Sequence, residues 1–219
     1  AATASAGSNG LIYLPFLAGE RCPVNDPHAR ACFVGMSSRT SRAEMCRACY
    51  EGICYAVRSL VALLPPNATA AAVATAASHQ SIKTQPSNTS VTKAFEAANA
   101  CVTPLVLVGG GGVSRVLPQI LADVLQREVV VPPHPADVAA IGAAEIAACV
   151  TGFDVLPCEA GQVGGESVMP NSVAAQQAQK ACRKWQPVPA LADIYNRTFE
   201  AYCGLHPGLC NTFEKLAAL

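Results

Sequence analysis

Residues 104–152 read PLVLVGGGGVSRVLPQILADVLQREVVVPPHPADVAAIGAAEIAACVTG. The apolar run 105–108 predicts a short buried strand, which ends at the four consecutive glycines 109–112. An amphipathic run with helical spacing follows the glycines. The segment 126–131 ends in β-branched residues and predicts a second strand, and the small residues of 137–150 predict another helix. The predicted order is therefore a strand, a glycine turn, a helix, a strand and a helix.

A glycine turn between a strand and a helix suits the binding of another molecule. Glycine has no Cβ to block a close approach to the backbone, and it adopts positive φ without strain. The N–H groups at the start of the following helix can face a negatively charged or polar ligand. Ser114 adds a hydrogen-bonding hydroxyl at that helix start. Taken alone, the glycine run also fits a tight turn that binds no ligand.

Two further helices are predicted from local patterns. Ser41 followed by Glu44 is a capping-box pattern, so one helix should begin near Ser41 and end before Pro65. The last helix should span about 191–203. Three aromatic side chains share one face of this last helix and predict a core-packing stripe, and they are Tyr195, Phe199 and Tyr202.

Three other stretches accompany the glycine turn. Residues 10–36 read GLIYLPFLAGERCPVNDPHARACFVGM, residues 42–64 read RAEMCRACYEGICYAVRSLVALL, and residues 187–209 read PVPALADIYNRTFEAYCGLHPGL. The first resembles the signature GL.FLPYL.GER.P..DP.ARG.F.GL of the FGGY carbohydrate kinases, and the second resembles the LARAVLEGVAYALRD helix of that family. The third is similar to the tail of xylulokinases, and 104–152 is similar to the family's adenosine-binding segment. Their shared order makes the resemblance far more specific than any one motif.

The resemblance implies an α/β fold. FGGY kinases are sugar and polyol kinases with the actin-like, ribonuclease H-like fold, so the chain should be a partial actin-like ATPase domain, the C-terminal half of a two-domain sugar kinase. Residues 1–219 would then be its C-terminal nucleotide-binding domain, with an insertion at about 67–99 and without the N-terminal sugar-binding domain. In the family, the catalytic aspartate and the glycine–threonine phosphate hairpins lie upstream of the GER motif. No catalytic residue is therefore expected in this sequence.

The resemblance also implies where a nucleotide binds. The glycine turn and Ser114 would contact ATP. Gly142 would let its helix pack against the turn and the adenine, although close helix packing alone explains this glycine equally well. Two residues depart from the family pattern, since family members often have alanine at Gly112 and xylulokinases often have an aromatic residue at Leu117. The predicted nucleotide-binding residues are Gly109, Gly110, Gly111, Gly112, Ser114 and Gly142.

The run GERCPVNDPHAR at 19–30 carries charged side chains that invite a catalytic assignment. His28 has no partner pattern and should be exposed, and no Ser-His-Asp or metal-ligand pattern emerges from the four histidines. Structural or interdomain ion pairs are the simpler interpretation of the other charged residues, which are Glu20, Arg21, Asp26 and Arg30.

The composition argues against several classes of partner and site. Fifteen basic and fifteen acidic residues cancel and no basic block occurs, so no nucleic-acid partner is expected. No membrane partner is expected either, since Glu145 interrupts the longest apolar candidate. The eleven cysteines include Cys46 and Cys49 inside a predicted helix. We interpret them as reduced, packed thiols rather than redox or zinc sites, which favours the cytoplasm or a peroxisome-like organelle.

The residues and the resemblance together predict an ATP-dependent carbohydrate kinase that uses Mg²⁺. D-Xylulose is the expected sugar, with gluconate, ribulose and glycerol as alternatives. A non-catalytic nucleotide-binding module is a second hypothesis, because the family's upstream motifs are absent. A dinucleotide-binding oxidoreductase is a third, but no third glycine and no downstream acidic residue complete its motif. Missing upstream strands should leave a sheet edge exposed, so a homodimer is also expected.

Overall fold

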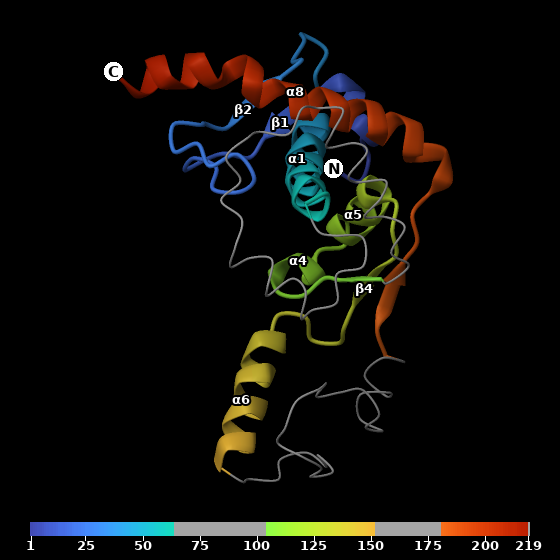
Figure 1. The fold of residues 1–219 in the computed structure, drawn as a ribbon. Helices are drawn as coiled ribbons and strands as arrows, with labels where there is room; N and C mark the ends of the chain where they lie inside the picture. Colours follow the sequence, from blue (N-terminus) through green and yellow to red (C-terminus); the bar gives the residue numbers. More distant parts are fainter. Residues whose placement is uncertain (64–103, 152–180, 219) are drawn as a thin grey trace. The chain divides into compact units, whose positions relative to one another are not determined.

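A computed structural model describes residues 1–63, 104–151 and 181–218 (Figure 1). The insertion expected at about 67–99 lies outside the described residues. The chain divides into two compact units, and each is described by itself. Of the described residues, the first unit comprises 1–63, 119–127 and 186–218, and the second comprises 104–118, 128–151 and 181–185.

Helix α1, Arg42–Val61, begins as predicted. The Ser41 hydroxyl oxygen accepts the backbone N–H of Glu44 at 3.3 Å, and the Glu44 carboxylate accepts the backbone N–H of Ser41 at 2.6 Å. This reciprocal capping box satisfies N–H groups that the start of a helix leaves without an intrahelical partner.

Helix α1 packs against a small antiparallel sheet in the first unit. β1, Ile12–Leu14, pairs with β2, Cys32–Val34. Gly52 permits the close approach of α1 to β1, because a Cβ at this position would collide with the carbonyl oxygen of Tyr13. A larger residue at position 52 would therefore force the helix away from the strand.

Helix α8, Ala192–Ala217, is preceded by the short turn η2, Pro189–Leu191, and is longer than predicted. The prediction that it ends near Cys203 was wrong, because the helix continues through Pro207 and buries Phe213 beyond it. A proline removes one N–H donor from a helix, but burial of apolar side chains on both sides can outweigh that loss. The predicted aromatic stripe is confirmed, with exposed fractions of 0%, 0% and 5% at Tyr195, Phe199 and Tyr202.

Most of helix α5, Leu117–Leu125, belongs to the first unit and is buried there. Ile120 and Val124 are among its almost completely buried side chains. Asp123 is 4% exposed, and its carboxylate accepts the backbone N–H of Val188 at 2.9 Å. Burial raises the pKa of Asp123 above its ordinary value, while its hydrogen bonds act in the opposite direction.

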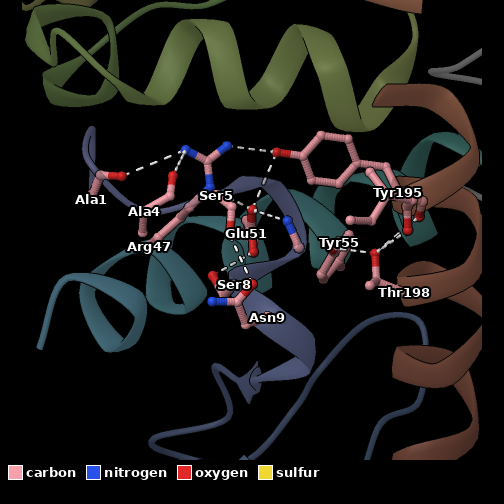
Figure 2. A network of polar contacts seen from close by, with 12 residues as sticks. Ala1, Ala4, Ser5, Ser8, Asn9, Arg47, Glu51, Tyr55, Tyr195 and Thr198 are labelled. Atoms are coloured by element: carbon pink, nitrogen blue, oxygen red, sulfur yellow. Dashed lines mark hydrogen bonds and ion pairs between the residues drawn. The ribbon is translucent and has the colours of Figure 1, made fainter. Parts of the chain in front are cut away.

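A buried ion pair joins three parts of the first unit (Figure 2). Glu51 on α1 is 1% exposed, and its carboxylate accepts from Arg47 Nε at 2.8 Å and from the Tyr195 hydroxyl of α8 at 3.2 Å. The same carboxylate accepts the backbone N–H of Gly7 at 2.9 Å and the hydroxyl of Ser8 at 2.7 Å. Glu51 therefore holds the N-terminal segment against both helices.

The N-terminal turn η1, Ala6–Gly10, depends on this carboxylate. Gly7, Ser8 and Asn9 have left-handed φ values of 74°, 47° and 52°. Such values cost free energy in residues other than glycine. The buried hydrogen bond from Ser8 to Glu51 offsets part of that cost.

The charged run of 19–30 is a structural loop in the first unit. The Glu20 carboxylate accepts backbone N–H groups within its own loop, including those of Cys22 at 3.1 Å and Val24 at 2.9 Å. Asp26 Oδ2 lies 2.8 Å from Nε2 of His206 on α8, and His206 is only 5% exposed. The structural interpretation therefore fits Glu20 and Asp26, and His28 is exposed as predicted.

The Asp26–His206 pair should make stability depend on pH. Burial raises the pKa of Asp26, but the hydrogen bonds from His206 and the loop backbone outweigh it and hold the pKa below 3.8. A lowered folded-state pKa gives stability that is present above the unfolded-state pKa and is lost as pH falls through the folded-state value. Asp26→Asn should thus lower the free energy of unfolding by about 1–3 kcal/mol at neutral pH.

Urea unfolding of both proteins at several pH values measures this difference. The deficit of Asp26→Asn should shrink as the pH falls from about 5 to about 3, where the wild-type carboxylate takes up a proton. A deficit that stays constant across this range would contradict the assignment.

The cysteines follow the prediction only in part. Seven cysteines of the described part of the chain form no disulfide bond, and they are Cys22, Cys32, Cys46, Cys49, Cys54, Cys203 and Cys210. Cys54 is buried, and burial raises the pKa of its thiol, as expected of a packed side chain. Cys46 is exposed, so the prediction that it packs as a small apolar residue was wrong, because it lies on a face of α1 that no described residue covers.

The second unit contains a three-stranded sheet with the order β3-β4-β5. β3, Leu105–Val106, runs parallel to β4, Val129–Val131, and β5, Arg183–Trp185, runs antiparallel to β4. The predicted strand at 126–131 begins later than expected because Gln126 has a left-handed φ of 53°. β5 was not predicted, since its three residues show no apolar alternation.

Helix α6, Val138–Thr151, follows β4 in the second unit and confirms the predicted order of elements. Within the described ranges, no helix combines the length and the apolar composition that crossing a membrane requires.

Candidate functional site

The glycine turn lies directly after β3 in the second unit. The chain leaves the sheet with a hydrogen bond from the Leu107 N–H to the Val130 carbonyl at 2.9 Å. Gly109 then has φ 76° and ψ −164°, a combination that is essentially restricted to glycine. The Gly109 N–H donates to the Pro135 carbonyl at 2.6 Å, which fixes the start of the turn.

The next residues form α4, Gly110–Val113, so the predicted turn contains one short helical turn. Two of its glycines face the interior. A Cβ at Gly111 would lie 3.2 Å from Leu117 Cδ2, and a Cβ at Gly112 would lie 2.7 Å from Pro135 Cβ. The absence of a side chain at Gly112 is therefore a packing requirement, and alanine there would require Pro135 to shift.

The other two glycines of the turn face open space. A Cβ at Gly109 or at Gly110 would meet no described atom within 4 Å. These two positions leave the backbone accessible to a second molecule, which is the property that glycine gives to a binding turn. The structure thus divides the four predicted glycines into an accessible pair and a packed pair.

Ser114 follows the turn and orients its hydroxyl by capping the next helix. Its Oγ accepts the backbone N–H groups of Val116 at 3.3 Å and Leu117 at 3.1 Å. A serine hydroxyl has two acceptor lone pairs and one donor hydrogen. Because both lone pairs are used, the remaining capacity of Ser114 is to donate to an acceptor atom, such as a ring nitrogen.

Gly142 is the sixth predicted residue and lies in α6. A Cβ at this position would meet nothing within 4 Å among the described residues. The predicted packing of Gly142 against the glycine turn is therefore not seen there.

Sequence reasoning missed two features around the turn. Val108 and Val113 flank the glycines with exposed fractions of 46% and 59%, so apolar surface is exposed at both ends of the turn. Arg183 of β5 donates from Nη2 to the Gly112 carbonyl at 3.0 Å. No local signal could have identified Arg183, because the contact joins residues 71 positions apart.

The described side chains do not form a metal site. No group of three or more His, Cys, Asp or Glu side chains with metal-binding geometry occurs in the part of the chain that the structure describes. The chemistry offered by the turn is thus hydrogen bonding and apolar contact rather than metal coordination.

Comparison with known proteins identifies related sequences. The chain is 42% identical over 62 residues to the xylulose kinase of Staphylococcus xylosus, and the match covers 28% of this chain and 13% of that protein. It is 29% identical over 126 residues to the gluconokinase of Bacillus subtilis (strain 168), with 58% of this chain and 19% of that protein covered. The chain thus matches only a minor part of the length of these relatives.

A solved structure shows the same fold. The xylulose kinase from Rhodospirillum rubrum aligns with a TM-score of 0.59 at 25% identity, over 97% of this chain and 33% of that one. The fold is therefore that of a part of the FGGY sugar kinases, consistent with the C-terminal domain of an actin-like ATPase. Residues 1–151 match the model of the FGGY family of carbohydrate kinases, C-terminal domain, and the chain belongs to this family.

Proposed function

We propose that this chain is the nucleotide-binding part of an ATP-dependent carbohydrate kinase, with ATP at the glycine turn. The observation that carries the proposal is that a Cβ at Gly109 or Gly110 would meet no described atom within 4 Å, in a turn that is followed by a serine hydroxyl whose remaining hydrogen-bonding capacity is to donate. The backbone of the two glycines would lie against the nucleotide, and Ser114 would donate to an acceptor on the base. The apolar surface of Val108 and Val113 suits one face of a planar ring.

The full protein would transfer the γ-phosphoryl group of ATP to a sugar hydroxyl. D-Xylulose is the proposed substrate, because a xylulose kinase is the relative with 42% identity. Gluconate is the first alternative, because a gluconokinase matches more of the chain at 29% identity. The residues of this chain would bind and orient ATP, and none of them is assigned as the catalytic base.

Magnesium belongs to the proposal only through ATP. The described residues include no group of three potential metal ligands, so they do not fit a protein-held Mg²⁺ site. The glycine turn, by contrast, fits a nucleotide through backbone access and one donor.

The location and the assembly are further parts of the proposal. The seven cysteines without a disulfide bond fit a reducing compartment, and we place the protein in the cytoplasm. A homodimer would form through β3, which is at the edge of the described sheet and exposes 62% of Val106. Sedimentation across a range of concentrations measures this, and a strictly monomeric chain would remove the dimer from the proposal.

Substitution of single glycines tests the nucleotide site. Gly110→Ala adds a methyl group that would meet no described atom beyond its own helical turn within 4 Å, so folding should be unaffected while ATP affinity falls at least about tenfold. Isothermal titration with ATP and Mg²⁺ measures the affinity, and thermal unfolding measures the stability.

Gly112→Ala is the matched control within the same turn. Its methyl group would press on Pro135 rather than on a ligand, so stability should fall by about 1–3 kcal/mol. Equal ATP affinity for the wild type and Gly110→Ala would remove the turn as the binding site.

A kinase assay on a longer protein that contains this chain tests the sugar substrate. If that protein phosphorylates none of xylulose, gluconate, ribulose and glycerol, the kinase assignment is refuted.

A further inference from the structure

Arg183 joins the last strand of the second unit to the glycine turn. Its Nη2 donates to the Gly112 carbonyl at 3.0 Å. This carbonyl lies near the end of the four-residue helix α4, where carbonyl groups have no intrahelical partner. A guanidinium is a strong donor to such an oxygen because the hydrogen bond is charge-assisted.

The position of Arg183 is fixed by its strand neighbours. Arg183 pairs with Val131 in the β4–β5 register, and Val131 Cγ1 would lie 3.1 Å from a Cβ at Gly112. The guanidinium carbon lies 5.2 Å from the centre of the Trp185 ring, two residues along β5 and on the same face of the strand. Two adjacent strands therefore approach Gly112. Val131 of β4 lies next to its Cα, and Arg183 of β5 donates a hydrogen bond to its carbonyl.

The turn is consequently held at both ends. The Gly109 N–H donates to Pro135 at 2.6 Å at the start, and Arg183 holds the Gly112 carbonyl at 3.0 Å at the end. Gly110, whose Cβ position is open, lies between the two fixed points. Ser114 comes next, tied to the turn by its N–H to the Gly111 carbonyl at 3.2 Å.

We propose that Arg183 is a positioning residue for the nucleotide site: it sets the Gly112 carbonyl and thereby the backbone from Gly109 to Ser114. This inference rests on the proposed function for the identity of the ligand, and Arg183 itself is not placed against the nucleotide. Strand β5 then contributes to the binding site through the conformation that Arg183 gives to the turn.

The neighbouring residue supplies a matched control. Lys184 alternates to the other face of β5 and forms an ion pair with Glu128 at 3.8 Å. Lys184→Met removes one positive charge from the same strand without touching the turn. Arg183→Met removes the donor, and Arg183→Lys retains the charge in case the methionine variant fails to fold.

The test uses the 219-residue chain and two independent measurements. Amide NMR signals of Gly109, Gly110 and Gly112 report the turn without any ligand, and calorimetry with ATP and Mg²⁺ reports binding. In Arg183→Met the glycine amides should shift and ATP affinity should fall about tenfold or more, with an intermediate effect in Arg183→Lys and none in Lys184→Met.

The outcomes separate this inference from the proposed function. Glycine amides that do not move in Arg183→Met overturn the inference, whatever happens to binding. If the glycine amide signals shift in Arg183→Met while ATP affinity stays unchanged, Arg183 holds the turn but is not a positioning residue for the nucleotide site. If the wild-type chain binds no ATP, the nucleotide assignment fails for this chain, and the amide comparison still decides whether Arg183 holds the turn.

Discussion

Glu51→Ala should lower the free energy of unfolding of the chain by about 3–5 kcal/mol, because it breaks a buried ion pair from one side. Arg47 would lose its carboxylate partner while remaining 9% exposed. Burial, with the Glu51 charge next in size, raises the pKa of Tyr195, so this hydroxyl stays protonated and would lose an acceptor. The left-handed turn at Ser8 would lose the contact that stabilises it.

Urea unfolding followed by circular dichroism measures this effect. Glu200→Ala is the matched control, since it removes an exposed carboxylate from a helix of the same unit and should change stability by less than about 0.5 kcal/mol. A loss below about 1 kcal/mol for Glu51→Ala would show that Arg47 finds other partners, and the role assigned to the carboxylate would be wrong.

Phe199→Ala should cost a similar amount, about 3–5 kcal/mol, by leaving a cavity in the core. Phe199 is 0% exposed, and its ring lies 6.1 Å from that of Tyr55 and 6.4 Å from that of Tyr202. The guanidinium carbon of Arg58 lies 4.3 Å from the centre of the Phe199 ring. The side chain thus combines apolar burial with a desolvated cation–π contact.

Phe199→Leu separates these two contributions. Leucine fills much of the volume but has no π face for Arg58, so its loss in urea unfolding should be about 1–2 kcal/mol. If leucine and alanine destabilise equally, the ring contact rather than the volume dominates, and the cavity explanation is wrong.

The sequence predicted those structural features that depend on residues close to one another along the chain. The Ser41–Glu44 capping box depends on residues three apart, and the aromatic stripe of α8 depends on helical periodicity. The glycine turn was predicted because strand, glycines and helix adjoin in the sequence. Local patterns also predicted the order of these elements, whereas the family resemblance supplied the actin-like fold and the expected ligand.

Features that depend on distant residues were missed or mistaken. His206 pairs with Asp26 across 180 positions, and neither residue carries a local sign of the other. β5 is recognisable only from its pairing with β4, because its three residues are exposed or half-buried and do not alternate. The four glycines look alike in the sequence, and only the positions of Pro135 and Leu117 distinguish the packed pair from the accessible pair.

The contact between Arg47 and Tyr195 joins residues 148 positions apart, and this has a consequence for biosynthesis. At about 5–20 residues per second, roughly seven to thirty seconds pass between the emergence of the two partners from the ribosome. During this interval α1 carries Glu51 and Arg47 without the helix that covers them. A product terminated before α8 would contain every residue of the glycine turn and yet could not close its first core, so chaperones and proteases would meet it as an unfolded chain.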